Sequence, residues 1–260
     1  MAPFVISQCS IADGTTLAAN SIPAFWADPH WVLAWRHRTL EYHVSQIALR
    51  FPRNLLNNRE ALRHQKAVDI DTGRILGYAR WRLPTSYEIN TDDGTPTWPD
   101  AQVPAVEPGK EAEIRRIAKT VIWDPNDDAD ELLDRINALE KEVTPKTPYY
   151  REIFPGLTRR LIGLEYLAVH PENQRKGVGT ALVKSGMDQA DKMGLNIFVH
   201  ALREGAELYK RVGFRLIAEL VQDDSPYGGS GVYGTYFFIY EPGSRADSAQ
   251  LLVLRVLDTR

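Results

Sequence analysis

Three consecutive stretches decide the fold: LIGLEYLAVHPENQRKGVGTALVKSGMDQADKMG (residues 161–194), LNIFVHAL (195–202) and REGAELYKRVGF (203–214). Residues 165–169 are a predicted strand that Pro171 ends, and a glycine-bearing loop then leads into a helix that runs to about Met193. The apolar run 195–202 predicts a second strand, and a helix that carries Tyr209 follows it. This order predicts a site for a phosphate-bearing cofactor, which favours a transferase.

The loop before the first helix has the properties of an anion site. It consists of Gln174, Arg175, Lys176, Gly177, Val178, Gly179 and Thr180. The two glycines let the backbone approach a ligand closely, and the unpaired N–H groups of the first helical turn face an anion. Arg175 and Lys176 can add positive charge to the grip on a phosphate. We therefore expect the loop to hold a pyrophosphate.

Two common phosphate loops do not fit this spacing. A nucleotide-hydrolase loop needs two glycines five positions apart followed by Lys and Ser or Thr, whereas Lys176 precedes its glycine. A dinucleotide fingerprint needs a third glycine three positions beyond Gly179, where this chain has Leu182. Both alternatives therefore fail at specific residues.

The remaining pattern, Q-x-x-G-x-G between a strand and a helix, resembles the pyrophosphate motif of the GNAT superfamily of acyl-CoA-dependent N-acyltransferases. The resemblance extends to LAVHP before the loop, to the strand after the helix and to LYKRVGF around Tyr209. It implies an α/β fold with a mixed, mainly antiparallel sheet, helices on both faces and a splay between the central strands. It also implies that acetyl-CoA is the cosubstrate.

The resemblance assigns the cofactor-binding residues. The main chain of Leu167, Ala168 and Val169 would pair with the amide-bearing arm of the cofactor, as an added strand would. The loop from Gln174 to Thr180 would hold the pyrophosphate. Tyr209 falls where many members place a phenol near the sulfur, so it is the predicted general acid for the departing thiolate. Packing beside Phe214 is the alternative role of this tyrosine.

Two residues are candidates for the base. Glu165 lies on the strand before the loop, near positions where some members use a glutamate. His200 ends the second strand, where similar sequences often have Glu, and histidine as a residue type suits a base near neutral pH. We expect one of the two to serve, although either could be an ordinary hydrogen-bonded strand residue.

The rest of the chain suggests one elaborated domain, residues 1–240, with an insertion at about 85–155. Helices are predicted at 39–51, which Pro52 would end, and at 128–143, the first helix after a proline-rich stretch. Asp71, Thr72 and Gly73 mark a hairpin. The apolar tail, 241–260, is expected to dock on the domain or on a partner chain, which would be a second copy in a homodimer.

Composition limits the classes of function. The formal net charge of -3 argues against a nucleic-acid partner. Cys9 is the chain's one cysteine, and it supplies neither a disulfide nor a cysteine-based metal site; no metal is expected. No apolar stretch approaches the roughly 18 residues of a membrane span. The location expected from these features is the cytoplasm.

The predicted reaction is direct transfer of an acetyl group from acetyl-CoA to an amine, with a small-molecule amine as the partner. Cys9 lies far from the signature in sequence and no other covalent nucleophile is identified, so an acyl-enzyme is not expected. Two alternatives remain open. The first is another acyl donor or a hydroxyl acceptor on the same scaffold. The second is a CoA-binding or regulatory protein without turnover.

Overall fold

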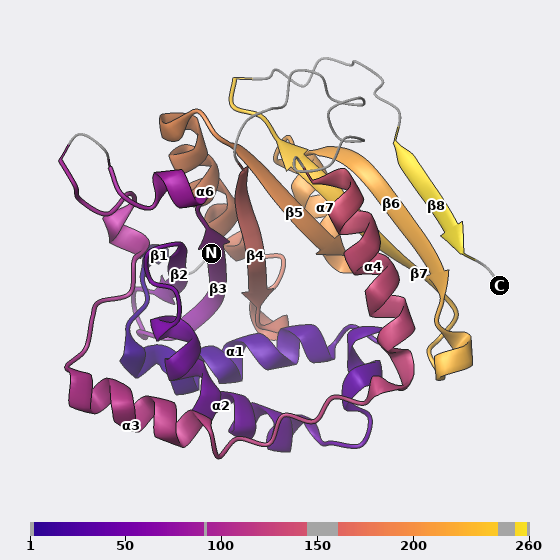
Figure 1. The fold of residues 1–260 in the computed structure, drawn as a ribbon, viewed down its shortest axis with the longest axis horizontal. Helices are drawn as coiled ribbons and strands as arrows, with labels where there is room; N and C mark the ends of the chain where they lie inside the picture. The colour runs from indigo at the N-terminus through magenta and orange to yellow at the C-terminus, as the bar shows by residue number, and fades with distance from the viewer. Residues whose placement is uncertain (1–2, 91–92, 145–160, 244–252, 259–260) are drawn as a thin grey trace. The chain divides into compact units, whose positions relative to one another are not determined.

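Figure 1 shows the computed structural model of the protein, which describes residues 3–90, 93–144, 161–243 and 253–258. The chain forms two compact units. Unit 1 consists of Met1–Ala27, Trp35–Pro125 and Glu165–Gly186, and unit 2 consists of Asp28–Ala34, Asn126–Leu164 and Met187–Arg260. Strand β4 (Leu161–Val169) begins in unit 2 and ends in unit 1, and helix α6 (Val178–Met193) begins in unit 1 and ends in unit 2.

The strands of unit 1 are β1 (Phe4–Gln8), β2 (Leu62–Asp69), β3 (Ile75–Arg82) and the end of β4, neighbours in that order. β1 pairs antiparallel with β2, and β2 pairs antiparallel with β3. The predicted hairpin between β2 and β3 is confirmed. Its turn is stabilised by the Asp69 carboxylate, which accepts from the N–H groups of Asp71 and Thr72, and by Gly73 at a φ of 70°.

Helices α1 (Gly14–Trp26) and α2 (Leu40–Leu56) pack together in unit 1. The prediction that Pro52 ends this second helix is wrong, because the apolar stripe of Ile47, Phe51 and Leu55 continues past it into the core. The proline ring is accommodated by Gly14, where an added Cβ would lie 2.8 Å from the ring. Burial of the stripe therefore outweighs the backbone hydrogen bond that proline cannot donate.

The proline-rich part of the predicted insertion contains more regular structure than expected. Helix α3 (Pro108–Ala118) was not predicted, although proline at the first helical position is favourable. Its sequence signal was hidden by charged residues, which leave Ile114 and Ala118 as its buried residues. Helix α4 (Asp130–Val143) matches the prediction for 128–143 within two residues, and a 3₁₀ turn, Asp127–Ala129, precedes it. Residues 145–160 of the insertion lie outside the described part of the chain.

Unit 2 holds the start of β4 and the strands β5 (Asn196–Leu202), β7 (Val232–Tyr240), β6 (Arg215–Asp223) and β8 (Leu254–Asp258), in that order. β4 and β5 run parallel, and so do β6 and β8. β7 runs antiparallel to both β5 and β6. The apolar tail residues 254–258 therefore form an edge strand, whereas 244–252 and 259–260 are not described.

Helices cover both faces of the unit 2 sheet. Phe237 and Phe238 are neighbours on β7, so their side chains point to opposite faces. α4 packs on the Phe237 face through Ile136, Leu139 and Val143. Helix α7 (Arg203–Arg211) packs on the other face, where Tyr209 contacts Phe238.

The predicted fold class is confirmed as a mixed, mainly antiparallel sheet with helices on both faces. The pairing of β4 with β5 runs from Leu161↔Asn196 to Leu164↔Val199 and stops there, as expected at a splay. No helix in the described part of the chain is both long and apolar enough to cross a membrane. The single domain over 1–240 stays a prediction.

Candidate active site

The predicted pyrophosphate loop lies in unit 1, between β4 and α6. A short 3₁₀ turn, Pro171–Asn173, follows β4, and α6 begins at Val178. Arg175 and Gly177 both take left-handed backbone conformations, with φ values of 59° and 82°. Such backbone costs little for glycine but is uncommon for arginine, so the loop is held in a specific shape.

The start of α6 leaves backbone donors unpaired beside the loop. The first helical hydrogen bond of α6 runs from the N–H of Ala181 to the Gly177 carbonyl, at 3.0 Å. The N–H groups of Val178, Gly179 and Thr180 precede this bond, so they belong to the unpaired first turn. Arg175 and Lys176 are exposed beside them. The geometry is that of an anion site and fits a pyrophosphate.

Helix α6 is held close to β3 by two small residues. An added Cβ at Gly186 would lie 2.2 Å from the Trp81 ring, and one at Gly77 would lie 2.7 Å from a Val178 methyl. Val178 and Leu182 are buried under this contact. The start of α6, which carries the donor groups, is therefore fixed on a rigid support.

Side chains donate hydrogen bonds to two backbone carbonyls at the end of β4, just before the loop. The Asn20 amide donates to the Ala168 carbonyl at 3.4 Å, and the Gln174 amide donates to the Val169 carbonyl at 3.3 Å. Gln174 therefore ties the loop to the end of β4. Residues 165–169 continue β4 beyond its pairing with β5, which is where the cofactor arm was expected to pair.

Glu165 forms ion pairs with two arginines of β3. Its Oε2 lies 3.1 Å from Nε of Arg80, and its Oε1 contacts Nε of Arg82. Both carboxylate oxygens are therefore engaged, and the Arg80 guanidinium also lies over the Tyr166 ring. A role as base would require Glu165 to leave this cluster. The alternating Arg80 and Arg82 were visible in the sequence, but nothing local paired them with β4.

Tyr209 lies on α7 in unit 2 with only 4% of its surface exposed. Its ring contacts Phe214 at 5.4 Å and Phe238 at 5.8 Å between centroids, so it does pack as a core residue. Its hydroxyl makes no hydrogen bond to any residue that the structure describes. Burial raises the pKa of Tyr209 well above its ordinary value, which keeps the hydroxyl protonated. The side chain thus combines a packed ring with a free donor.

His200 lies on β5, on the other face of the unit 2 sheet. Its ring stacks on Phe237 at 5.3 Å, and its Nδ1 lies 3.7 Å from Oε2 of Glu140 on α4. The pairing of β5 with β4 ends one residue earlier, at Val199. His200 and Tyr209 are therefore not in contact, and they flank the strand end of β5 from opposite faces.

The two units divide the predicted site residues. Unit 1 carries the loop, the strand residues Leu167, Ala168 and Val169, and Glu165, whereas unit 2 carries Tyr209 and His200. The sequence reasoning missed Glu140, because α4 and β5 are separated by some 60 positions and no local pattern links them.

Comparisons with known proteins agree with the signature. Residues 145–216 match the family model described as an acetyltransferase (GNAT) domain. No curated protein matches the sequence. The predicted class of enzyme, an acetyltransferase, is confirmed by the family match.

Solved acetyltransferase structures are similar to the chain at low sequence identity. A Drosophila melanogaster polyamine N-acetyltransferase is 14% identical with a TM-score of 0.46, over 92% of this chain and 100% of that one. A histone acetyltransferase and related acetyltransferase from Corynebacterium glutamicum is 17% identical with a TM-score of 0.49, over 94% and 98%. An N-acetyltransferase from Thermoplasma acidophilum, in complex with coenzyme A, is 14% identical with a TM-score of 0.42, over 92% and 99%. These likenesses add no argument about substrate, whereas the family model covers the signature itself: residues 145–216 match a GNAT acetyltransferase domain.

Proposed function

We propose that this protein moves the acetyl group of acetyl-CoA directly to an amine, with Tyr209 as the general acid. The observation that carries the proposal is the loop from Gln174 to Thr180. Its left-handed Arg175 and Gly177 lead straight into the unpaired N–H groups at the start of α6. Acetyl-CoA is the donor whose pyrophosphate suits this loop.

The transfer requires proton movements on both reactants. Removing the proton from an alkyl ammonium group at pH 7 costs about 4.6 kcal/mol of free energy, so a base must take that proton before the amine attacks. The departing thiolate needs a proton in turn. In this proposal Tyr209 serves the thiol and His200 serves the amine; the Tyr209 ring contacts Phe238, and the His200 ring stacks on Phe237.

A direct transfer is supported by the state of the chain's one cysteine. Cys9 is fully buried in the core of unit 1, and burial raises the pKa of its thiol well above its ordinary value. A thiol in this environment is a poor nucleophile because the thiolate is the reactive form. The acetyl group is therefore expected to pass to the amine without an acyl-enzyme.

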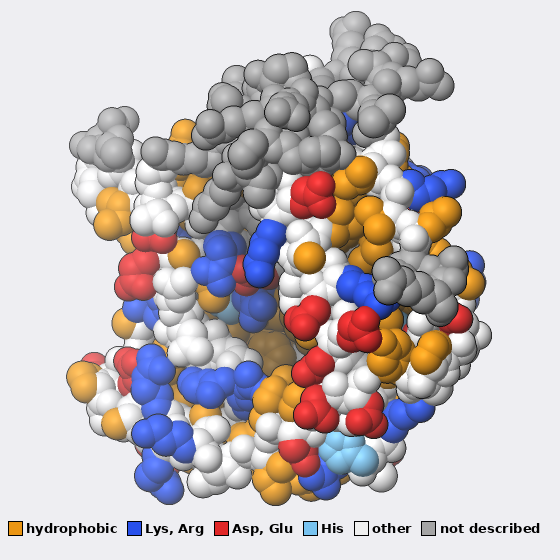
Figure 2. All heavy atoms as spheres, turned by 45° about the vertical axis from the view of Figure 1, so that its right-hand side comes forward, with side chains coloured by type: hydrophobic (Ala, Val, Ile, Leu, Met, Phe, Trp, Pro, Cys, Tyr) orange, Lys and Arg blue, Asp and Glu red, His pale blue; other side chains and the backbone are white. Residues whose placement is uncertain are grey.

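The charges of unit 2 support a cationic acceptor. Figure 2 shows acidic side chains gathered over the region of α4. The exposed carboxylates at and before its first turns belong to Asp127, Asp128, Asp130, Glu131 and Asp134. They stabilise the helix N-terminus, and their combined field also attracts an ammonium group at long range. A small-molecule amine is the proposed acceptor. A homodimer, a cytoplasmic location and the lack of a nucleic-acid partner remain predictions from the sequence.

The proposal is tested first by isothermal titration with acetyl-CoA. Gly177→Glu places a negative side chain at a φ of 82°, so we expect it to weaken binding at least about 100-fold. Gly109→Glu is the matched control, because Gly109 has open space around it and an ordinary backbone. A folded parent protein that does not bind acetyl-CoA would overturn the proposal.

Thiol release across a panel of amines then measures turnover. Release with at least one amine supports the transferase. Binding without release from any amine would favour the CoA-binding or regulatory alternative, and release with an alcohol or another acyl-CoA would favour the alternative substrates.

A further inference from the structure

The imidazole of His200 has two nitrogens in different surroundings. Its Nδ1 faces Glu140, at 3.7 Å from Oε2, whereas its Nε2 is buried and has no hydrogen-bond partner among the described residues. The imidazole ring is held in place by stacking on the Phe237 ring, with 5.3 Å between the ring centroids. A buried nitrogen without a partner costs free energy, so its retention calls for an explanation such as a catalytic role.

Glu140 is brought to His200 by the packing of α4. Leu139, the residue before it, and Ile136 and Val143 are buried in the core of unit 2 together with Phe237. This burial fixes the rotation of the helix, so Glu140 lies at the boundary of the buried stripe. Its side chain is 41% exposed and that of His200 is 29% exposed, which leaves the pair at the edge of the core.

His200 has an aromatic ring and a carboxylate as its neighbours. β7 presents the Phe237 ring, with which His200 is also paired in register. α4 presents Glu140, the one charged group that lies within ion-pair distance of His200 in the described part of the chain. The electrostatic surroundings of the imidazole are thus set chiefly by one carboxylate.

We propose that Glu140 is a positioning residue for His200. This inference rests on the proposed function. The carboxylate favours the tautomer that carries its proton on Nδ1, which leaves the lone pair on Nε2 to accept a proton. Sequences that resemble this chain often have a glutamate at the position of His200. This chain then uses His200 on β5 together with the Glu140 carboxylate from α4.

The protons balance in this arrangement. The ammonium group of the acceptor loses two protons in forming an amide. One replaces the proton that Tyr209 gives to the departing thiolate, and the other passes to Nε2 of His200 and then to solvent. Glu140 stabilises the imidazolium cation while it exists. No oxidant, metal or covalent enzyme intermediate is needed.

The test compares Glu140→Gln with Glu142→Gln, which removes the same charge from an exposed position of the same helix. In Glu140→Gln we expect kcat/KM to fall about tenfold, because the carboxylate that holds the Nδ1–H tautomer is lost. Glu142→Gln should leave kcat/KM unchanged. A parental rate in Glu140→Gln would overturn the proposal, as would a parental rate in His200→Gln.

A second readout does not depend on turnover. NMR of the histidine ring nitrogens reports the tautomer of His200, which His200→Gln identifies by loss of its signal. We expect the Nδ1–H tautomer to predominate in the parent and its population to fall in Glu140→Gln. An unchanged tautomer population would overturn the role of Glu140. A changed tautomer population in a protein that acetylates no amine would instead show that the pair exists and that the proposed function fails.

Discussion

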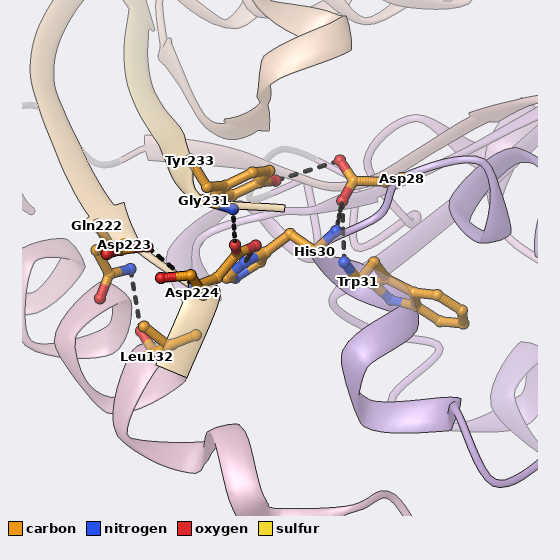
Figure 3. A network of polar contacts seen from close by, with 10 residues as sticks. Asp28, His30, Trp31, Leu132, Gln222, Asp223, Asp224, Gly231 and Tyr233 are labelled. Carbon is orange, nitrogen blue, oxygen red and sulfur yellow. Dashed lines mark hydrogen bonds and ion pairs between the residues drawn. The ribbon is translucent and has the colours of Figure 1, made fainter. Parts of the chain in front are cut away.

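Nδ1 of His30 lies 3.2 Å from Oδ2 of Asp224, a pairing between residues nearly two hundred positions apart in the sequence. Figure 3 shows that the pair belongs to a larger polar network in unit 2. The other Asp224 oxygen accepts from the Gly231 N–H at 2.7 Å, and the His30 ring stacks on Tyr233 at 3.9 Å. The network fastens residues 28–34 to the hairpin between β6 and β7.

Asp28 completes this attachment. Its Oδ1 accepts from the backbone N–H groups of His30 and Trp31, each at 2.9 Å, and its Oδ2 accepts from the Tyr233 hydroxyl at 3.2 Å. Burial and the neighbouring Asp28 carboxylate raise the pKa of Tyr233 well above its ordinary value, so this hydroxyl remains a donor. Two carboxylates thus hold the 28–34 segment from both sides.

Asp224→Ala should destabilise the protein by about 3 kcal/mol, because it leaves His30 and the Gly231 N–H without their buried partner. Asp224 is only 1% exposed, so water cannot replace the lost contacts easily. Urea unfolding measures the effect. Asp71→Ala, at an exposed turn position, should cost less than about 0.5 kcal/mol. Equal effects of the two substitutions would show that the network contributes little.

Acid should destabilise unit 1 through two buried histidines. Burial is the main cause that lowers the pKa of His43 to about 4 and that of His64 to about 3. The unfolded chain binds these protons near pH 6.5. Stability from the neutral histidines is therefore present above about pH 6.5 and is lost as pH falls toward these lower values, by about 1.4 kcal/mol per pH unit for each histidine.

The histidine prediction is checked by the free energy of unfolding between pH 7 and pH 4.5. His64→Gln should reduce the pH slope, because glutamine cannot take up a proton. His37→Gln is the control, since the side chain of His37 is 40% exposed. A parental slope in His64→Gln would show that other groups cause the acid sensitivity.

Arg63 should be a major source of stability for the segment that follows β3. It is fully buried and donates to the backbone carbonyls of Thr97, Arg59, Glu60 and Leu62, at 2.8 to 3.0 Å. Burial lowers its pKa to about 10, so it remains charged at pH 7. We expect Arg63→Met to cost about 3 kcal/mol or more in urea unfolding. Arg74→Met, at an exposed side chain, should be nearly neutral; similar costs would contradict this role.

The sequence predicted the elements whose signals are local. The β2–β3 hairpin follows from Asp71, Thr72 and Gly73, and α6 ends at Met193 as expected because Gly194 takes a left-handed φ of 62°. The glycine loop was found for the same reason, since its spacing lies within seven residues. Pro52 does not end α2 as predicted, because its local penalty is offset by burial of a stripe that the whole of α2 shares.

What the sequence could not show are pairings between distant residues. Glu165 was a candidate base from its place on β4, but its two arginine partners come from β3. Glu140 and Asp224 have no local feature that separates them from other acidic residues. Their partners are set by the packing of α4 and by the β6–β7 hairpin, which only the folded chain defines.

Tyr209→Phe separates the two roles of this tyrosine. Phenylalanine keeps the ring contacts with Phe214 and Phe238, so stability and acetyl-CoA affinity should stay close to parental. Loss of the hydroxyl should lower kcat about 100-fold if it protonates the thiolate. Because burial raises the pKa of Tyr209, the parent should keep its rate through pH 10, where an exposed tyrosine would lose its proton.

Tyr240→Phe is the matched control for Tyr209→Phe. Tyr240 also contacts the Phe214 ring, at 5.4 Å, but its hydroxyl donates to Asp191 at 2.7 Å and so is already engaged. Burial raises the pKa of Tyr240 to about 12, so its hydroxyl too stays protonated over the range of the assay. We expect a parental kcat in Tyr240→Phe. A parental kcat in Tyr209→Phe as well would mean that Tyr209 serves only as a core residue, and the proton for the thiolate would have to come from solvent.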